Sequence, residues 1–207
     1  MVLMDWLRRR WFQAFVHALA LAPLAGILLD LVRGAFLADP VREVTTRTGR
    51  AALRLLLASL ACTPLSTLVG IGHLRTARRP LGLYAFLYTA LHFLTFAGLD
   101  YRFDLRFLVP AIFQQRFVLP GLAAGLILLA LATTSTAAWQ KRMGKSWKRL
   151  HRMAYVAGAL AVLHVAWLLK DLNESLRYGA FLALLLFLRW RPPQDRLARL
   201  GQRLTRS

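Results

Sequence analysis

The chain has 207 residues, of which 57% are hydrophobic, and it carries 28 Lys and Arg against nine Asp and Glu. Soluble proteins average about 45–50% apolar residues, whereas here the apolar residues form unbroken runs long enough to cross roughly 30 Å of hydrocarbon. This pattern excludes an ordinary soluble globule and a disordered basic tail, and the single cysteine, Cys62, excludes an internal disulfide.

Six apolar stretches predict an all-α integral membrane protein, a six-transmembrane-helix bundle in a single domain over residues 1–207. Each stretch is bounded by charged residues, Pro or Gly, and its ordinary helix formers favour a helix over a barrel strand. A basic tail is expected over residues 191–207. The expected membrane helices cover about 12–32, 51–71, 80–99, 117–139, 150–169 and 176–190.

The distribution of charge predicts the side of the membrane on which each loop lies. The N-terminus, the loop near 75–79, the segment 141–152 and the C-terminal tail together hold 18 basic and 2 acidic residues, whereas the alternate loops hold 10 and 7. Because cytoplasmic loops carry the excess of Lys and Arg, both termini are expected in the cytoplasm. The basic charge therefore indicates topology and contact with anionic lipid, not nucleic-acid binding.

Two of the five histidines, His92 and His164, are predicted to lie at the same depth in the membrane. His92 comes about 12 residues into the third expected helix, and His164 about 14 residues into the fifth. Both helices run outward, so at about 1.5 Å per residue the two heights differ by only about 3 Å. Two imidazoles at one level on parallel helices can hold a b-type haem from opposite faces. The structural alternative is that each histidine is hydrogen-bonded to a neighbouring helix.

A further histidine, His151, begins the fifth expected helix, about 20 Å along the axis from His164. That separation leaves room for a second haem, but thirteen helical steps place the two side chains roughly 140° apart on a straight helix. The partner of His151 is not evident from the sequence. The candidates are His17 in the first expected helix and His73 in the loop before the third expected helix.

Two arginines near the start of the second expected helix, Arg50 and Arg54, are candidate haem or cofactor contacts. The planar guanidinium matches the carboxylate geometry of a haem propionate. The alternative is that these side chains extend to the membrane surface.

Residues 38–65, 78–96 and 134–170 closely resemble the MsrQ family, which comprises haem-binding membrane subunits of the bacterial periplasmic protein-methionine-sulfoxide reductase system. That family belongs to the ferric-reductase-like transmembrane group. The resemblance implies a bacterial inner-membrane protein that passes electrons from a cytoplasmic flavin reductase or the quinone pool to a periplasmic molybdopterin enzyme. That enzyme reduces methionine sulfoxide in oxidised envelope proteins. The family's haem histidines fall on His92, His151 and His164, and His17 also matches a family histidine, whereas His73 does not.

The resemblance also implies b haem, in one or two copies, and FMN. No glycine fingerprint for a dinucleotide is present, so the electron donor is expected to be a separate protein or a quinol. If FMN binds, a cationic loop offers candidates for holding its phosphate, although contact with lipid headgroups is the alternative reading of that loop. Its residues are Lys141, Arg142, Lys145, Lys148 and Arg149.

The sequence therefore predicts an electron-transfer subunit with no substrate chemistry of its own. One alternative is a stand-alone transmembrane metalloreductase, which would share the haem but not the periplasmic partner. The other is a haem-free small transporter or scaffold, which would be colourless when purified.

Overall fold

The computed structural model describes residues 2–36, 39–168 and 172–190 of the chain. Over these residues the structure is helical, without strands, so the predicted all-α class is confirmed. The basic tail expected at 191–207 lies outside the described residues. The elements are α1 (Val2–Val32), α2 (Pro40–Leu68), α3 (Leu74–Leu94), the π-helix η1 (Thr95–Asp100), α4 (Leu105–Gln114), α5 (Val118–Thr133), α6 (Ala137–Met143), α7 (Lys145–His151), α8 (Met153–Leu168) and α9 (Leu172–Trp190).

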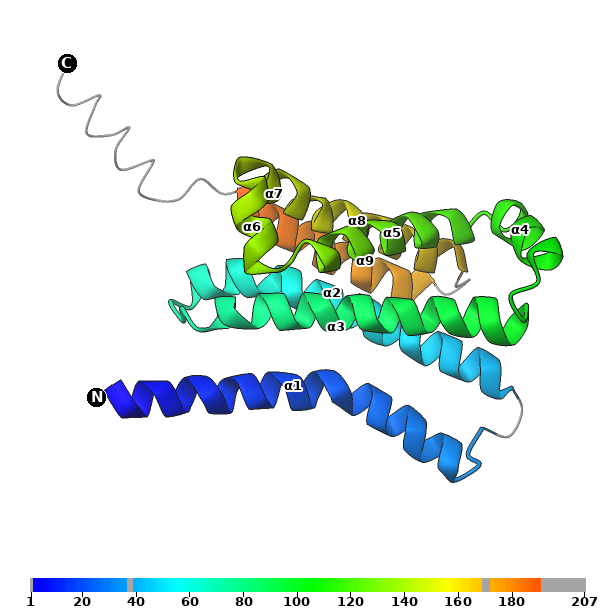
Figure 1. Cartoon of the computed structure of the whole chain (residues 1–207), viewed down its shortest axis with the longest axis horizontal. Helices are drawn as coiled ribbons and strands as arrows, with labels where there is room; N and C mark the ends of the chain where they lie inside the picture. The colour runs from blue at the N-terminus through cyan, green and yellow to red at the C-terminus, as the bar shows by residue number, and fades with distance from the viewer. Residues whose placement is uncertain (1, 37–38, 169–171, 191–207) are drawn as a thin grey trace, which may run out of the picture.

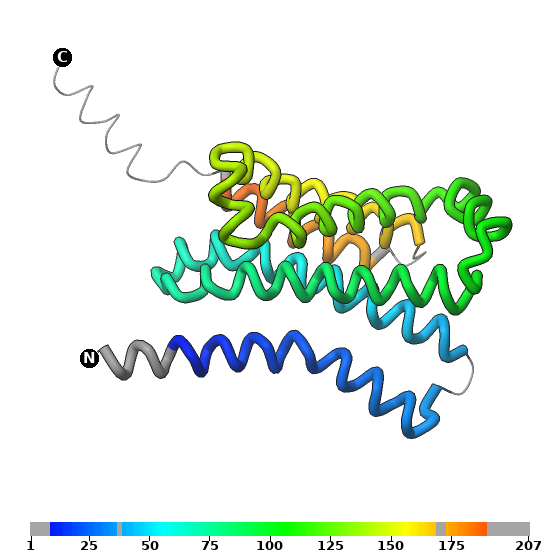
Figure 2. The backbone as a smooth tube through the Cα atoms, in the orientation of Figure 1, coloured from blue at the N-terminus to red at the C-terminus, as the bar shows by residue number. Residues whose placement is uncertain are grey.

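The long helices lie side by side and alternate in direction along the bundle (Figure 1). Helix α2 packs mainly on α3, and α5 packs mainly on α8, while α9 contacts both α2 and α8. Helix α1 lies against α2 and α3, away from the α5–α8–α9 side (Figure 2). Helix α4 lies at one end of the bundle, and α6 and α7 lie at the opposite end.

Three helical segments among the described residues are long and apolar enough to cross a membrane: 9–32, 40–68 and 74–100. Helices α4 and α5 meet this condition only as a pair, and that pair is bent by 104°. Helices α5 and α8 have 16 residues each, and α9 contains Glu174, Arg177 and Arg189 among its 19 residues. The structure thus supports a multi-pass membrane protein, while six spans stay a prediction.

The boundaries of the fourth expected helix, 117–139, are wrong. Helix α5 ends at Thr133, and a separate helix, α6, begins at Ala137. The hydroxyls of Thr133 and Thr134 donate to carbonyls one turn earlier, and the Thr136 hydroxyl accepts from the Trp139 N–H to cap α6. Hydroxyl side chains that bond to the local backbone compete with continuation of a helix. The apolar run alone did not reveal this break.

The second helix begins at Pro40, well before the expected start at residue 51. Its first turn has the features of a capped N-terminus, since the Asp39 carboxylate accepts from the Arg42 N–H at 3.0 Å and Pro40 occupies the first helical position. The polar segment 40–50 ahead of the apolar run is therefore helical as well. This extension carries Thr45 and Gly49, which contribute to the site described below.

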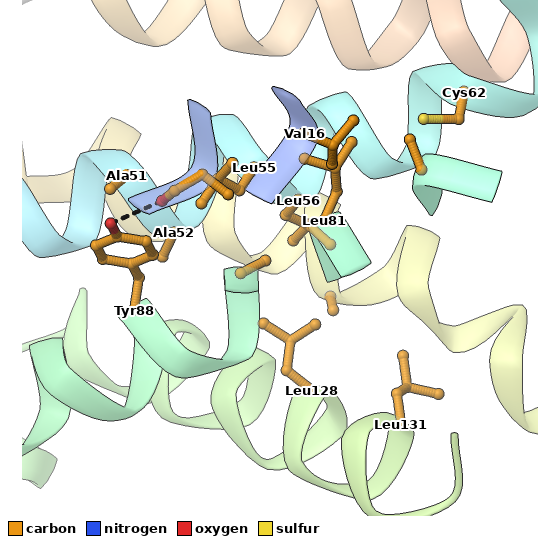
Figure 3. Close-up of a cluster of buried hydrophobic side chains, with 14 residues drawn as sticks. Val16, Ala51, Ala52, Leu55, Leu56, Cys62, Leu81, Tyr88, Leu128 and Leu131 are labelled. Carbon is orange, nitrogen blue, oxygen red and sulfur yellow. Dashed lines mark hydrogen bonds between the residues drawn. The ribbon is translucent and has the colours of Figure 1, made fainter. Parts of the chain in front are cut away.

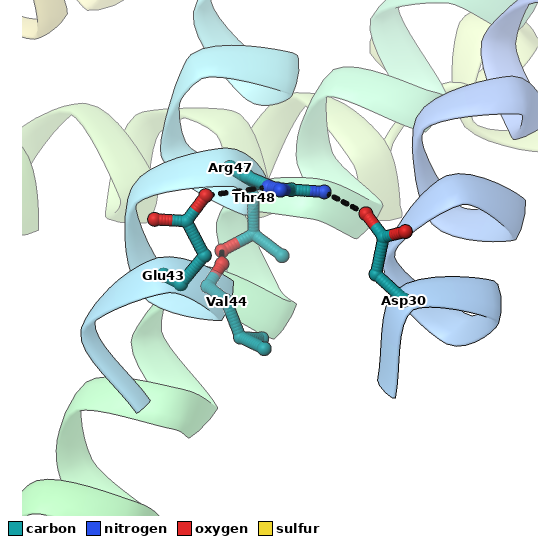
Figure 4. A network of polar contacts seen from close by, with 5 residues as sticks. All are labelled: Asp30, Glu43, Val44, Arg47 and Thr48. Carbon is teal, nitrogen blue, oxygen red and sulfur yellow. Dashed lines mark hydrogen bonds and ion pairs between the residues drawn. The ribbon is translucent and has the colours of Figure 1, made fainter. Parts of the chain in front are cut away.

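The first helix is tied to the start of α2 by an ion-pair network (Figure 4). Arg47 donates to the Asp30 carboxylate at the end of α1 at 2.5 Å and to Glu43 on its own helix at 2.7 Å. The neighbouring Thr48 is buried and donates to the Val44 carbonyl at 2.7 Å. Together these contacts fix the first turns of α2 against α1.

Buried side chains from α1, α2, α3, α5 and α8 form the main core, in which Tyr88 is fully buried (Figure 3). The Tyr88 hydroxyl donates to the Ala20 carbonyl at 2.8 Å and accepts from the Leu24 N–H at 3.0 Å. In a regular helix these two backbone groups would bond to each other. The hydroxyl is thus inserted in the backbone ladder of α1 beside Pro23, where a bend is expected.

Replacing Tyr88 by phenylalanine is expected to destabilise the protein by about 1–3 kcal/mol, because the Ala20 and Leu24 backbone groups lose their partner. The measurement is the midpoint of thermal unfolding in detergent, followed by circular dichroism. Tyr84→Phe is the matched control, since Tyr84 lies one turn earlier on α3 and its hydroxyl lies 3.0 Å from the Nδ1 of the exposed His17. Equal shifts in the two variants would show that the inserted hydroxyl contributes nothing specific.

Candidate functional site

The imidazole rings of His92 and His164 lie next to one another, although they belong to different helices. His92 lies near the end of α3 and His164 near the end of α8. Their ring centres are 6.0 Å apart, and the ring planes are nearly perpendicular, at 83°. The structure thus brings together the two histidines for which the sequence predicts equal depth.

Each of these rings is held through its Nδ1 atom by a main-chain carbonyl of another helix. The Nδ1 of His92 lies 2.8 Å from the Thr45 carbonyl oxygen of α2, and the Nδ1 of His164 lies 2.6 Å from the Phe117 carbonyl oxygen, just before α5. A carbonyl can only accept, so each Nδ1 carries the proton and donates it. The Nε2 of each neutral imidazole is then left with a lone pair, which is the form that binds a metal.

A glycine makes each of these hydrogen bonds sterically accessible. A Cβ atom on Gly49 would lie 3.0 Å from the His92 Nδ1, and one on Gly121 would lie 2.6 Å from the His164 Nδ1. Each glycine comes four residues after the accepting carbonyl, which in an α-helix points toward that position. The absent side chain therefore exposes the carbonyl to the ring.

The two halves of this site have the same construction. In both, the accepting carbonyl precedes its histidine by 47 residues, and a glycine of the same helix lies against the ring. The α2–α3 pair and the α5–α8 pair thus present their histidines in equivalent ways from the two sides of the bundle.

The spacing of the rings fits a single metal ion held between them. Metal–imidazole bonds are about 2.0–2.1 Å, and a ring nitrogen lies about 1.1 Å from its ring centre, so two opposed imidazoles place their centres about 6 Å apart. In the described part of the chain, no group of three or more His, Cys, Asp or Glu side chains is placed to hold a metal. Two histidine ligands with the remaining positions supplied by a macrocycle is the arrangement that haem iron can take.

Comparison with known proteins identifies the family of this chain. Residues 48–162 match the family described as ferric reductase like transmembrane component. The protein-methionine-sulfoxide reductase heme-binding subunit MsrQ of Xanthomonas axonopodis pv. citri (strain 306) is 42% identical over 181 residues, which cover 84% of this chain and 83% of the relative. The chain belongs to the MsrQ family. The MsrQ protein of Xanthomonas campestris pv. campestris (strain 8004) is 43% identical over 178 residues, covering 83% of this chain and 82% of that protein. No solved structure matches the chain.

In this MsrQ family member, the other predicted histidine, His151, lies at the opposite end of the bundle. Its ring stacks on Trp147 with centres 4.0 Å apart, and its Nε2 lies 3.3 Å from the Thr134 hydroxyl. It lines a cavity of about 510 Å³ in which it is the sole histidine among the lining residues of the described chain. His17 instead lies 3.0 Å from the Tyr84 hydroxyl, and His73 makes an edge contact with Phe12. Neither is brought to His151.

The two predicted arginines engage α9. The Arg50 guanidinium lies 3.0 Å from the Glu174 carboxylate, and the Arg54 Nε donates to the Tyr178 hydroxyl at 3.3 Å. These contacts join the middle of α2 to the first turns of α9. A role for either arginine toward a haem propionate stays a prediction.

The cationic loop predicted to hold the FMN phosphate forms α6, α7 and the turn between them at Gly144. Of its five candidates, Lys148 lines the cavity beside His151. Arg142 lies over the Trp139 ring, 5.4 Å from its centre. The remaining candidates, Lys141, Lys145 and Arg149, are exposed and do not line that cavity.

Sequence reasoning missed four residues of the histidine site: Thr45, Gly49, Phe117 and Gly121. Two of them act through main-chain carbonyls, which carry no side-chain signature. The one available signal was the repeated spacing, because a glycine precedes each histidine of the pair by the same number of residues.

Proposed function

We propose that this protein is the b-haem electron-transfer subunit of a protein-methionine-sulfoxide reductase system, with His92 and His164 as the axial ligands of the haem. The observation that carries the proposal is the opposed histidine pair, with ring centres 6.0 Å apart and both Nδ1 atoms already bonded to carbonyls. The printed names of the MsrQ relatives, which describe a heme-binding subunit, support the same cofactor.

The chain's own residues would hold the cofactor and set its environment. A bound haem would supply one-electron redox chemistry that no side chain of this site offers. The carbonyls of Thr45 and Phe117 fix the tautomer and the orientation of the two rings and increase their basicity as ligands. The hydroxyls of Thr45 and Thr95, 3.1 Å apart, join α2 to η1 beside the site and hold the first of these carbonyls in place.

The charge of the two ends supports the orientation that we propose for the protein in the membrane. Six acidic residues within the described chain lie near the end that holds α4 and the histidine pair, whereas α6 and α7 carry only basic charges (Figure 1). By the positive-inside rule, the α6–α7 end and both termini would face the cytoplasm of a six-span inner-membrane protein. The six acidic residues near the α4 end are Asp30, Asp39, Glu43, Asp100, Asp104 and Glu174.

On this orientation, electrons would enter from a cytoplasmic flavin reductase or a quinol and leave toward a periplasmic molybdopterin methionine-sulfoxide reductase. The segment from Asp100 to Arg116, which includes α4, is the proposed docking surface for that enzyme, since it projects at the outer end. A second haem at His151 would need an axial ligand other than the histidines that the structure describes. Binding of FMN is likewise proposed from the family resemblance alone.

The decisive experiment uses purified, haem-loaded protein reduced under anaerobic conditions and freed of excess reductant. We expect its b-type spectrum to reoxidise only when both the periplasmic reductase subunit of the same organism and methionine sulfoxide are added. Methionine in place of the sulfoxide is the control. A colourless protein would favour the scaffold alternative, and reoxidation by ferric chelates but not by the partner would favour a stand-alone metalloreductase.

A further inference from the structure

Helix α4 lies across one end of the bundle and is too short to cross a membrane. Its 10 residues extend over about 15 Å, which is half of the roughly 30 Å of hydrocarbon in a bilayer. It is bent by 104° from α5, which runs along the bundle (Figure 1). In a bilayer that the long helices cross, α4 would therefore lie nearly parallel to the membrane plane.

The turn before α4 fixes the helix in this direction. Arg102 and Phe103 adopt left-handed backbone conformations, with φ of 50° and 57°, which are unfavourable for residues other than glycine. The Phe103 N–H donates to the Ala97 carbonyl of η1 at 2.8 Å. The Asp104 carboxylate caps α4 by accepting from the Arg106 N–H at 2.9 Å. Because a strained turn persists only where the surrounding structure holds it, the direction of α4 is a fixed feature of the fold.

Two sides of α4 are apolar, but only one of them is covered by the bundle. The covered side packs inward through Leu108 and Ala111, each only 7% exposed. The other side is formed by residues four positions apart, which share one side of a helix. We call it the apolar stripe, and it consists of Leu105, Val109 and Phe113, which are 68%, 45% and 70% exposed.

A more polar side of α4 adjoins the apolar stripe. Arg106, Pro110 and Gln114 are exposed, and each follows a stripe residue by one position, which is about 100° around the helix. Arg102 and Arg116, shortly before and after α4, are exposed as well. An apolar side next to arginines is typical of helices that lie in the membrane interface, where arginine side chains extend toward the lipid phosphates.

We propose that α4 is an interfacial helix whose apolar stripe inserts into the lipid at the end of the bundle that holds the histidine pair. The partner of the stripe is the bilayer, because exposed apolar side chains continue along the chain on both sides of α4, at Leu99 of η1 and Leu119 of α5. Lipid phosphates also complement the charge of the arginines around it. The polar side of α4 stays available for the periplasmic reductase proposed to dock there. The inference does not depend on haem or on electron transfer.

The test measures which side of α4 is in contact with water when the protein lies in a bilayer. The full-length, haem-loaded protein is placed in nanodiscs of phosphatidylethanolamine and phosphatidylglycerol that hold one protein copy each. Its single cysteine is removed by Cys62→Ala, and a new thiol is introduced by Phe113→Cys or, as the matched control, by Gln114→Cys. We expect a charged, water-soluble maleimide to modify the thiol at 113 about tenfold or more slowly than the thiol at 114.

Slow modification at 113 with fast modification at 114 would support the proposal. Equally fast modification would overturn it, since the stripe would then face water and be open to a protein partner. Equally slow modification would also overturn it, because α4 would then have no water-facing side. Both thiols should react alike in denatured protein. If Phe113→Cys loses haem or helical circular dichroism, the pair Leu105→Cys and Arg106→Cys, one position apart in the same way, decides the question.

Discussion

Replacing either His92 or His164 by alanine is expected to remove the b-type haem spectrum from the purified protein. Each ring is one of two opposed ligands in the proposed site, with a centre-to-centre distance of 6.0 Å. With one ligand absent, the macrocycle would be held by a single axial bond and by packing. We expect haem per polypeptide, measured as the pyridine haemochrome, to fall by about tenfold or more.

His73→Ala is the control for this prediction, because His73 lies at the opposite end of α3 and its ring makes an edge contact with Phe12. Its haem content should equal that of the wild type. His151→Ala gives a third result: a fall to about half would reveal a second haem at the α6–α7 end. Intact b-type absorbance in the His92→Ala/His164→Ala double variant would refute the axial assignment, since both proposed ligands would then be dispensable.

The meeting of His92 and His164 could be predicted because it depends on a single fixed quantity, the rise of an α-helix. Counting residues from the cationic ends of two parallel helices gives their relative height without knowledge of any contact. The same counting predicts the direction of a side chain around the helix axis much less accurately. An error of one residue in the count turns the predicted direction by about 100°. The contact between the two rings therefore had to come from the structure.

Other parts of the site depend on contacts between residues far apart in the chain, and these have no sequence signal. Arg50 and Glu174 form an ion pair although 124 residues separate them. The end of α5 at Thr133 could not be predicted either. It depends on hydroxyl groups that donate hydrogen bonds to the backbone of their own helix. The family resemblance predicts which histidines bind haem, whereas the structure shows the carbonyls that hydrogen-bond to two of them.

The second large effect is expected at Gly121, which lies against the ring of His164. A Cβ atom there would be 2.6 Å from the Nδ1 and 2.9 Å from the Cε1 of that ring, closer than atoms without a bond can approach. In the Gly121→Ala variant the imidazole must therefore move away from the Phe117 carbonyl, which now accepts its Nδ1–H. Loss of such a supporting hydrogen bond costs about 10–100-fold in metal affinity, and we expect haem retention to fall within that range.

Helix propensity alone would predict the opposite effect of Gly121→Ala on stability. Alanine is favoured over glycine inside a helix by about 1 kcal/mol, so without the ring Gly121→Ala would stabilise α5. Gly125→Ala is the matched control, one turn further along α5, where the new Cβ would meet the Thr89 methyl group at an ordinary 3.4 Å. At Gly49 the corresponding contact with His92 is 3.0 Å, so Gly49→Ala should lose haem to an intermediate extent.

The measurement is the rate at which each variant gives up haem to a soluble scavenger, together with the haem reduction potential and the thermal midpoint. The expected order of haem loss is Gly121→Ala, then Gly49→Ala, then Gly125→Ala, with the last close to wild type. A merely structural role for these glycines would lower the thermal midpoint without changing the reduction potential. If Gly121→Ala keeps haem as well as Gly125→Ala does, the carbonyl and glycine support of the ring is not what holds His164 in its ligating orientation.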